Sequence, residues 1–158
     1  MKAVSRLLGA SFVLAFVLTA VPIPAWAVIW RPAWVALVLI YWCFALPQRV
    51  GVLVGWVSGL LLDVLNGTLL GQHAFGLALV AFVANRLHQR VRVLPPWQQA
   101  LTVFALVFGY QLLVVWVNGI RGLEVPGWAY VAAPLTSMVL WPWIFIVLRD
   151  LRRKFQVA

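Results

Sequence analysis

The sequence predicts an all-α polytopic membrane protein with six transmembrane helices. Of its 158 residues, 65% are hydrophobic and only 9% are charged. Soluble domains contain about 45–50% apolar and about 25% charged residues, so this chain has too few charged groups to cover a water-facing surface. The apolar residues also gather into six runs, which we expect to form one integral membrane domain over residues 1–158. The expected spans are residues 7–29, 33–46, 50–66, 69–85, 97–118 and 128–148.

The six runs fit a membrane helix, which needs about 20 apolar residues, to different degrees. The first run contains Pro22 and Pro24 near its end, where proline is expected to kink or break the helix. The second run is short, so a tilted span, a locally thinned bilayer and a re-entrant segment all remain open, and we favour a span. The other four runs have a suitable length.

The distribution of basic residues sets the predicted orientation. Lysine and arginine in short loops stay on the cytoplasmic side of a membrane. With six spans and both termini in the cytoplasm, ten basic residues lie inside and only Arg31 and Arg121 lie outside. Omitting the second span would move Arg49 and a group of three arginines outside, so the charge distribution favours six spans.

The N-terminus has an alternative interpretation as a cleavable signal peptide. Lys2 and Arg6 precede an apolar stretch, and Ala25-Trp26-Ala27 resembles a cleavage site. Cleavage would leave five spans in the same orientation. We favour an uncleaved first helix, because polytopic chains usually begin this way.

Glycines at intervals of four residues mark the third run. Residues four apart share one ridge of a helix, so Gly51, Gly55 and Gly59 form a smooth strip that allows close helix packing. Gly67 and Gly71 follow in the connection to the next run. The packing partner is either a helix of this chain or a helix of another protein, and these residues are our candidate packing or partner interface.

Asp63 continues the glycine ridge and is the only acid inside an apolar run. A carboxylate within the bilayer is costly, so Asp63 should face protein or water. It could serve a proton relay or a ligand site. We favour a structural role, in which Asp63 ties the turn at Asn66 to the next helix with His73 as a partner, because no further ionisable group continues a proton path.

Two basic clusters are expected at the cytoplasmic surface, one in the inner loop and one in the C-terminal tail: Arg86, Arg90 and Arg92, and then Arg149, Arg152, Arg153 and Lys154. Each such charge near an anionic leaflet contributes about 1 kcal/mol. Orientation and contact with membrane lipids explain these clusters, and docking of an acidic cytoplasmic partner is the alternative. Nucleic acid is not an expected partner, because no module or basic arm is present to deliver the contacts.

No catalytic or metal constellation is visible in the sequence. The three acids Asp63, Glu124 and Asp150 are far apart, the two histidines are predicted on opposite sides of the membrane, and Cys43 is the single cysteine. Catalysis needs such groups in pairs or triads. We therefore predict no enzyme activity, no cofactor and no metal. An intramembrane enzyme built on Asp63 is the weakest alternative.

Several short motifs stand in order along most of the chain: Trp30-Arg31-Pro32-Ala33-Trp34-Val35, Tyr41-Trp42, Leu46-Pro47-Gln48-Arg49-Val50, the stretch from Gly59 to Gly71 with Asp63, Trp97-Gln98-Gln99-Ala100-Leu101, and Leu140-Trp141-Pro142-Trp143-Ile144-Phe145 followed by Arg149. In combination they resemble the MreD family of small polytopic proteins that determine rod shape in bacteria. The loop around residues 119–127 departs from the family pattern.

The resemblance implies a non-catalytic scaffold of the elongation (rod) complex in the cytoplasmic (inner) membrane. The implied partners are the bitopic protein MreC, the actin-like MreB, the glycosyltransferase RodA and its class B penicillin-binding transpeptidase. It also implies a helix arrangement similar to the substrate-binding subunits of energy-coupling-factor transporters, although a shared fold does not carry function. The alternative is a transporter-like subunit that binds a small molecule or a lipid-linked precursor between its helices.

Overall fold

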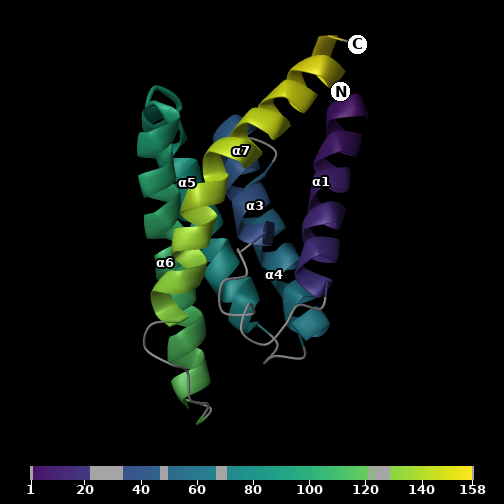
Figure 1. Ribbon diagram of the computed structural model, residues 1–158. Coiled ribbons are helices and arrows are strands. Elements are labelled where there is room, and N and C mark those ends of the chain that lie inside the picture. Colours follow the sequence, from purple (N-terminus) through teal and green to yellow (C-terminus); the bar gives the residue numbers. More distant parts are fainter. Residues whose placement is uncertain are drawn as a thin grey trace.

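The computed structural model describes residues 2–21, 34–46, 50–66, 71–120, 122 and 129–157. Every regular element in these residues is an α-helix, so the predicted all-α class is confirmed. The helices are α1 (Lys2–Ala20), α3 (Trp34–Ala45), α4 (Val52–Asn66), α5 (Gln72–Arg92), α6 (Pro96–Ile120) and α7 (Ala129–Val157). Both termini and the connection between α5 and α6 lie at the same end of the bundle, which is the upper end in Figure 1.

The short helix α3 lies at the centre of the bundle. All ten of its residues from Val35 to Phe44 are buried, and it contacts α1, α5, α6 and α7. A helix that is hydrophobic on every side is expected to be enclosed by others. Because its surroundings are protein, α3 does not need the length of a lipid-facing span, which explains how so short an apolar run fits the fold.

One buried hydrogen bond ties α3 to α1. The indole Nε1 of Trp42 donates to the hydroxyl oxygen of Ser11 over 2.9 Å, and that hydroxyl donates to the carbonyl of Leu8. Trp42 is fully buried, so its N–H has no access to water if this acceptor is lost.

The Ser11→Ala variant is therefore expected to lower the free energy of unfolding by about 1–3 kcal/mol, the cost of a buried donor without an acceptor. Thermal unfolding in detergent, followed by circular dichroism, measures this. Thr102→Ala is the control, because the Thr102 hydroxyl bonds only the Gln98 carbonyl of its own helix. Equal stability of the two variants would contradict the assigned role of the Trp42–Ser11 bond.

Helices α5 and α7 continue several residues beyond the ends of the predicted spans, so the expected inner-loop position of Arg86 and Arg90 is wrong. The span predicted at residues 69–85 is a helix that continues to Arg92, and Arg86 and Arg90 therefore lie on α5 rather than in a loop. The span predicted at 128–148 continues to Val157 and includes the basic tail. Arginine, lysine, leucine and glutamine are good helix formers, and basic side chains favour a helix C-terminus. Hydrophobicity marks where the apolar segment ends, which is not where the helix ends.

Two of the described helices are long and apolar enough to cross a membrane, over Trp97–Val117 of α6 and Pro134–Lys154 of α7. The 25 residues of α6 extend about 37 Å, compared with about 30 Å for the hydrocarbon core of a bilayer. Shorter apolar helices cover Ser5–Ala20, Trp34–Ala45 and Val52–Leu65.

Large apolar side chains also point outward, among them Leu53 at 73% exposure, Trp143 at 69% and Trp116 at 64%. Such a surface suits lipid rather than water.

The predicted first span is described only in part. The helix α1 ends at Ala20, and Pro22 and Pro24 lie outside the described residues. The expected break at these prolines therefore stays a prediction.

Candidate functional site

The glycine strip of α4 packs directly against α5. A Cβ atom built on Gly59 would lie 2.2 Å from the Cα of Ala74, and one built on Gly55 would lie 2.7 Å from the carbonyl oxygen of Leu77. Gly51 is less tightly enclosed, since its neighbour is the side chain amide of Asn85 at 2.9 Å. The sequence left open whether the strip packs against a helix of this chain or against a helix of another protein. In the structure, α5 of the same chain packs against it. No room remains there for a helix of another protein.

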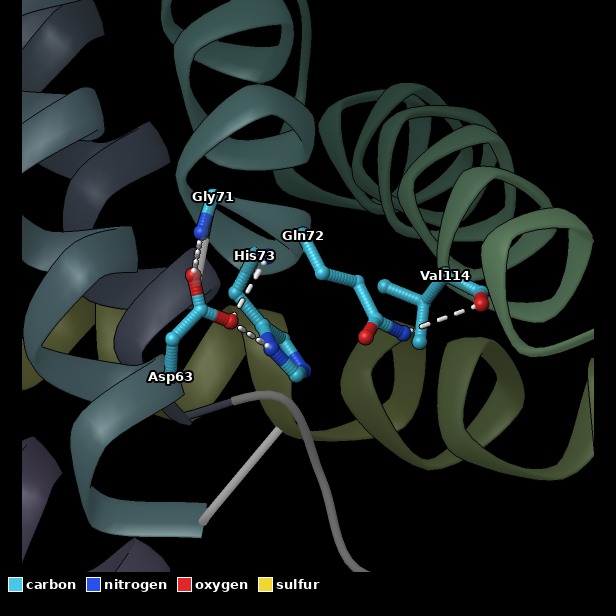
Figure 2. A network of polar contacts seen from close by, with 5 residues as sticks. All are labelled: Asp63, Gly71, Gln72, His73 and Val114. Carbon is cyan, nitrogen blue, oxygen red and sulfur yellow. Dashed lines mark hydrogen bonds and ion pairs between the residues drawn. The ribbon is translucent and has the colours of Figure 1, made fainter. Parts of the chain in front are cut away.

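Asp63 caps the first turn of α5 from the neighbouring helix, as Figure 2 shows. Its Oδ2 accepts a hydrogen bond of 2.8 Å from the backbone N–H of Gly71, and its Oδ1 accepts one of 2.9 Å from the N–H of His73. The first N–H groups of a helix have no partner inside the helix. Gly71, the N-cap residue, has no side chain to supply an acceptor, so the carboxylate of Asp63 replaces the usual capping side chain.

The same carboxylate binds the imidazole of His73. The Nδ1 atom of His73 lies 2.7 Å from Oδ1 of Asp63. Because a carboxylate only accepts, Nδ1 carries the proton in this contact. Asp63 is 1% exposed and His73 is 9% exposed, so the pair is buried between the two helices.

Gly71 has a positive φ of 100°. This left-handed conformation favours glycine, and it turns the chain into α5 at the point where Asp63 receives the N–H groups. Gly67, which the sequence places in the same connection, lies outside the described residues.

The opposite side of α5 is fixed to α6. The side-chain Nε2 of Gln72 donates to the backbone carbonyl of Val114 over 3.1 Å, as Figure 2 shows. A Cβ atom on Gly76 would lie 2.7 Å from the ring of Tyr110, and that ring also faces His73, with 5.9 Å between the ring centroids. The start of α5 is therefore held on two sides, by Asp63 from α4 and by α6.

This arrangement joins the end of α4 to the start of α5. Both carboxylate oxygens of Asp63 accept hydrogen bonds from the start of α5. Across the described part of the chain, no group of three His, Cys, Asp or Glu side chains comes together as a metal site would need. The hydrogen bonds of Asp63 agree with a structural role, which is one of the two interpretations that the sequence left open.

The basic residues lie at the end of the bundle that holds both termini. On α5, the guanidinium of Arg86 lies over the ring of Phe82, 5.2 Å from its centroid. On α7, Arg149 lies over Phe145 in the same way, and its Nε is 3.6 Å from Oδ1 of Asp150. Arg153 and Lys154 are exposed, while Arg149 and Arg152 are partly buried. The side chain of Arg92 lies outside the described part.

The α7 arginines border a cavity of about 560 Å³ that the sequence did not reveal. It lies between α3, α7 and the junction of α5 with α6, and its walls are Tyr41, Phe44, Ala45, Leu46, Val91, Gln99, Phe145, Arg149, Arg152 and Arg153. These residues are far apart in the sequence, and each has an ordinary explanation where it stands. No local motif could therefore have identified the cavity.

The wall of this cavity is held in place by Gln99. Its Nε2 donates to the carbonyls of Val91 and Leu94 at the α5–α6 junction, and its Oε1 accepts from the indole Nε1 of Trp141 at 3.4 Å. Gln99 thus links the α5–α6 junction to α7.

Comparison with known proteins identifies the family. The family profile described as rod shape-determining protein MreD matches residues 2–151. The rod shape-determining protein MreD of Haemophilus influenzae is 34% identical over 146 residues, which cover 92% of this chain and 90% of that protein.

The chain belongs to the MreD family. This membership confirms the resemblance inferred from the motifs and supports a role in cell shape. MreD proteins are shape-determining structural proteins and not a known enzyme family, and the two long apolar helices agree with a membrane location. No solved structure matches the chain. The likeness to the substrate-binding subunits of energy-coupling-factor transporters has no support here and stays a prediction.

Proposed function

We propose that this MreD-family chain is a non-catalytic scaffold subunit of the bacterial elongation (rod) complex. It crosses the cytoplasmic (inner) membrane six times with both termini in the cytoplasm, binds MreC, and helps to position peptidoglycan synthesis. Its other partners are MreB, RodA and the class B penicillin-binding transpeptidase. The observation that carries this proposal is the family match over residues 2–151, which covers nearly all of the six helices.

The distribution of polar groups supports a scaffold rather than an enzyme. The buried polar side chains Asp63, His73 and Gln99 bond helix ends or each other. Large apolar side chains are exposed on α1, α4, α5, α6 and α7. In lipid, helices associate through close van der Waals contact, so such lateral surfaces suit the binding of a partner helix.

We place the transmembrane helix of MreC in a groove between α1 and α7. MreC is bitopic and needs a surface for one helix, and the glycine strip is already covered by α5. The groove has a volume of about 300 Å³ and reaches down to α3. Its lining is almost entirely apolar: Ser11, Leu14, Ala15, Leu18, Trp34, Val38, Leu140, Trp143, Ile144, Val147 and Leu148. The small residues Ser11 and Ala15 would permit close approach of a helix.

Co-purification of tagged MreC from native membranes in mild detergent tests this assignment. Leu14 and Trp143 are 59% and 69% exposed at the edges of the groove. The double variant L14A/W143A is expected to reduce MreC recovery more than about tenfold, because two large contact side chains, each contributing on the order of 1–2 kcal/mol, are removed.

The matched control is L101A/W116A, which removes the same two side-chain types from exposed positions on α6 (55% and 64%). This variant should recover MreC like the wild type. Full recovery by L14A/W143A would exclude the α1–α7 groove. Failure of MreC to co-purify with the wild-type chain in any mild detergent would contradict the scaffold proposal itself.

A further inference from the structure

We propose that the cavity between α3, α7 and the α5–α6 junction binds the phosphate head group of an anionic membrane lipid. This inference goes beyond the scaffold proposal and uses different residues from the MreC groove. The volume of this cavity, about 560 Å³, lies within the range of about 300–1,000 Å³ that is typical of sites for small ligands.

The cavity is formed by the path of α7. In Figure 1 the C-terminal part of α7 leans away from α6 and crosses toward the N-terminus of α1. Pro142 lies inside this helix, and proline removes a helix hydrogen bond and permits a bend. The bend carries Arg149, Arg152 and Arg153 over the end of α3, where Phe44, Ala45 and Leu46 form part of the wall.

A buried hydroxyl group points to a ligand in the cavity. Tyr41 lines it and is only 2% exposed, yet its hydroxyl oxygen has no hydrogen-bond partner. A buried polar group without a partner costs about 1–3 kcal/mol, so such groups are uncommon in proteins and usually bond a water molecule, an ion or a ligand. A phenolic O–H donates well to a phosphate oxygen.

Two arginines of the cavity also have side-chain donors without a hydrogen-bond partner. The Nε atoms of Arg149 and Arg152 are buried and have no hydrogen-bond partner. The acid nearest to Arg149 in the described chain is Asp150, at 3.6 Å, and its side chain is 63% exposed. Three arginines and one solvated carboxylate leave an excess of positive charge. Guanidinium groups bind phosphate through paired N–H donors, so this set fits an anion with several oxygens.

The apolar half of the wall favours a lipid over an acidic protein segment. Besides the arginines, the cavity wall contains the apolar side chains of Phe44, Leu46, Val91 and Phe145, which would contact the glycerol and upper acyl carbons of a lipid. An acidic peptide would instead place its polar backbone against these apolar side chains. Basic pockets between membrane helices on the cytoplasmic side are suited to lipid head groups.

Native mass spectrometry of the full-length protein in detergent, titrated with phosphatidylglycerol, tests the proposal. The wild type is expected to retain one phosphatidylglycerol molecule in preference to phosphatidylcholine. The double variant R149Q/R152Q should bind it more than about tenfold more weakly, because two charge-assisted contacts are lost. R86Q/R90Q removes the same charge from α5, outside the cavity, and should bind like the wild type.

Tyr41→Phe provides a second variant that preserves the packing of α3. Removal of the hydroxyl alone should weaken phosphatidylglycerol binding about tenfold, the effect of one hydrogen bond to a charged group. The thermal stability of the lipid-free protein should stay equal or rise, because the lost hydroxyl has no partner there. A structural role for the hydroxyl would instead lower the stability and leave binding unchanged, and this result would overturn the proposal.

Three further outcomes would also overturn it. Equal retention of phosphatidylglycerol and phosphatidylcholine would show ordinary surrounding lipid. Saturation by inorganic phosphate at the same concentration as the lipid would identify a free anion as the ligand. Displacement of bound phosphatidylglycerol by a micromolar oligoglutamate peptide would indicate an acidic protein partner.

Discussion

Gly59→Ala is expected to destabilise the protein by about 3 kcal/mol, although alanine is the better helix former. The added Cβ would lie 2.2 Å from the Cα and 2.4 Å from the N of Ala74, and 2.5 Å from the carbonyl carbon of His73. All three neighbours are backbone atoms, so α5 as a whole must move away from α4. Overpacking of this kind typically costs about 1–3 kcal/mol and occasionally more, which exceeds the gain of about 1 kcal/mol in helix propensity.

Gly109→Ala is the matched control, because a Cβ at this position of α6 meets nothing within 4 Å. It should leave the midpoint of thermal unfolding unchanged or raise it slightly. The two variants are compared by thermal unfolding in the same detergent. A Gly59→Ala protein as stable as Gly109→Ala would show that α4 and α5 are not in the close contact described here.

Asp63→Ala is expected to have an effect of similar or larger size. The substitution leaves three donors without their acceptor, the N–H groups of Gly71 and His73 and the Nδ1–H of His73. Each buried donor left unpaired costs about 1–3 kcal/mol. We expect a loss of more than about 3 kcal/mol, measured by thermal unfolding, with the first turn of α5 opening before the rest of the protein.

A graded series separates capping from chemistry at Asp63. Asp63→Asn keeps one oxygen that can accept from a backbone N–H, so its stability should lie between those of the wild type and Asp63→Ala. Hydrogen exchange at the start of α5 should follow the same order. If Asp63→Ala is as stable as the wild type but cells lose their rod shape, the residue has a functional role that capping does not explain.

The sequence predicts the positions of the helices well because the hydrophobicity of a segment is a local property. The six apolar runs correspond to α1 and α3 to α7, and the spacing of Gly55 and Gly59 identified a real close contact. The partner of that contact could not be derived. A glycine strip indicates that another backbone packs closely against the helix. Only the fold shows that this backbone belongs to α5.

The basic cavity is the feature that the sequence could not supply. For the arginines of α7, the sequence predicts a basic cytoplasmic surface, because arginines that follow a membrane span usually lie in the cytoplasm. Tyr41 belongs to an apolar run more than 100 residues earlier, where it is part of a family motif but gives no sign of a ligand site. Their juxtaposition depends on the extension of α7 as a helix beyond Leu148 and on its course across α3. The course of α7 across α3 is a tertiary property, which no local pattern of the sequence shows.

The most direct test of the account is the side of the membrane on which each helix end lies. Native Cys43 is fully buried, so single cysteines can be introduced at Val93 (82% exposed) and Ile120 (72% exposed), and at the exposed Lys154. A membrane-impermeant maleimide should label Ile120→Cys in cells with a permeabilised outer membrane. It should label Val93→Cys and Lys154→Cys only in inverted inner-membrane vesicles. Labelling of Lys154→Cys and Ile120→Cys from the same side would contradict the account.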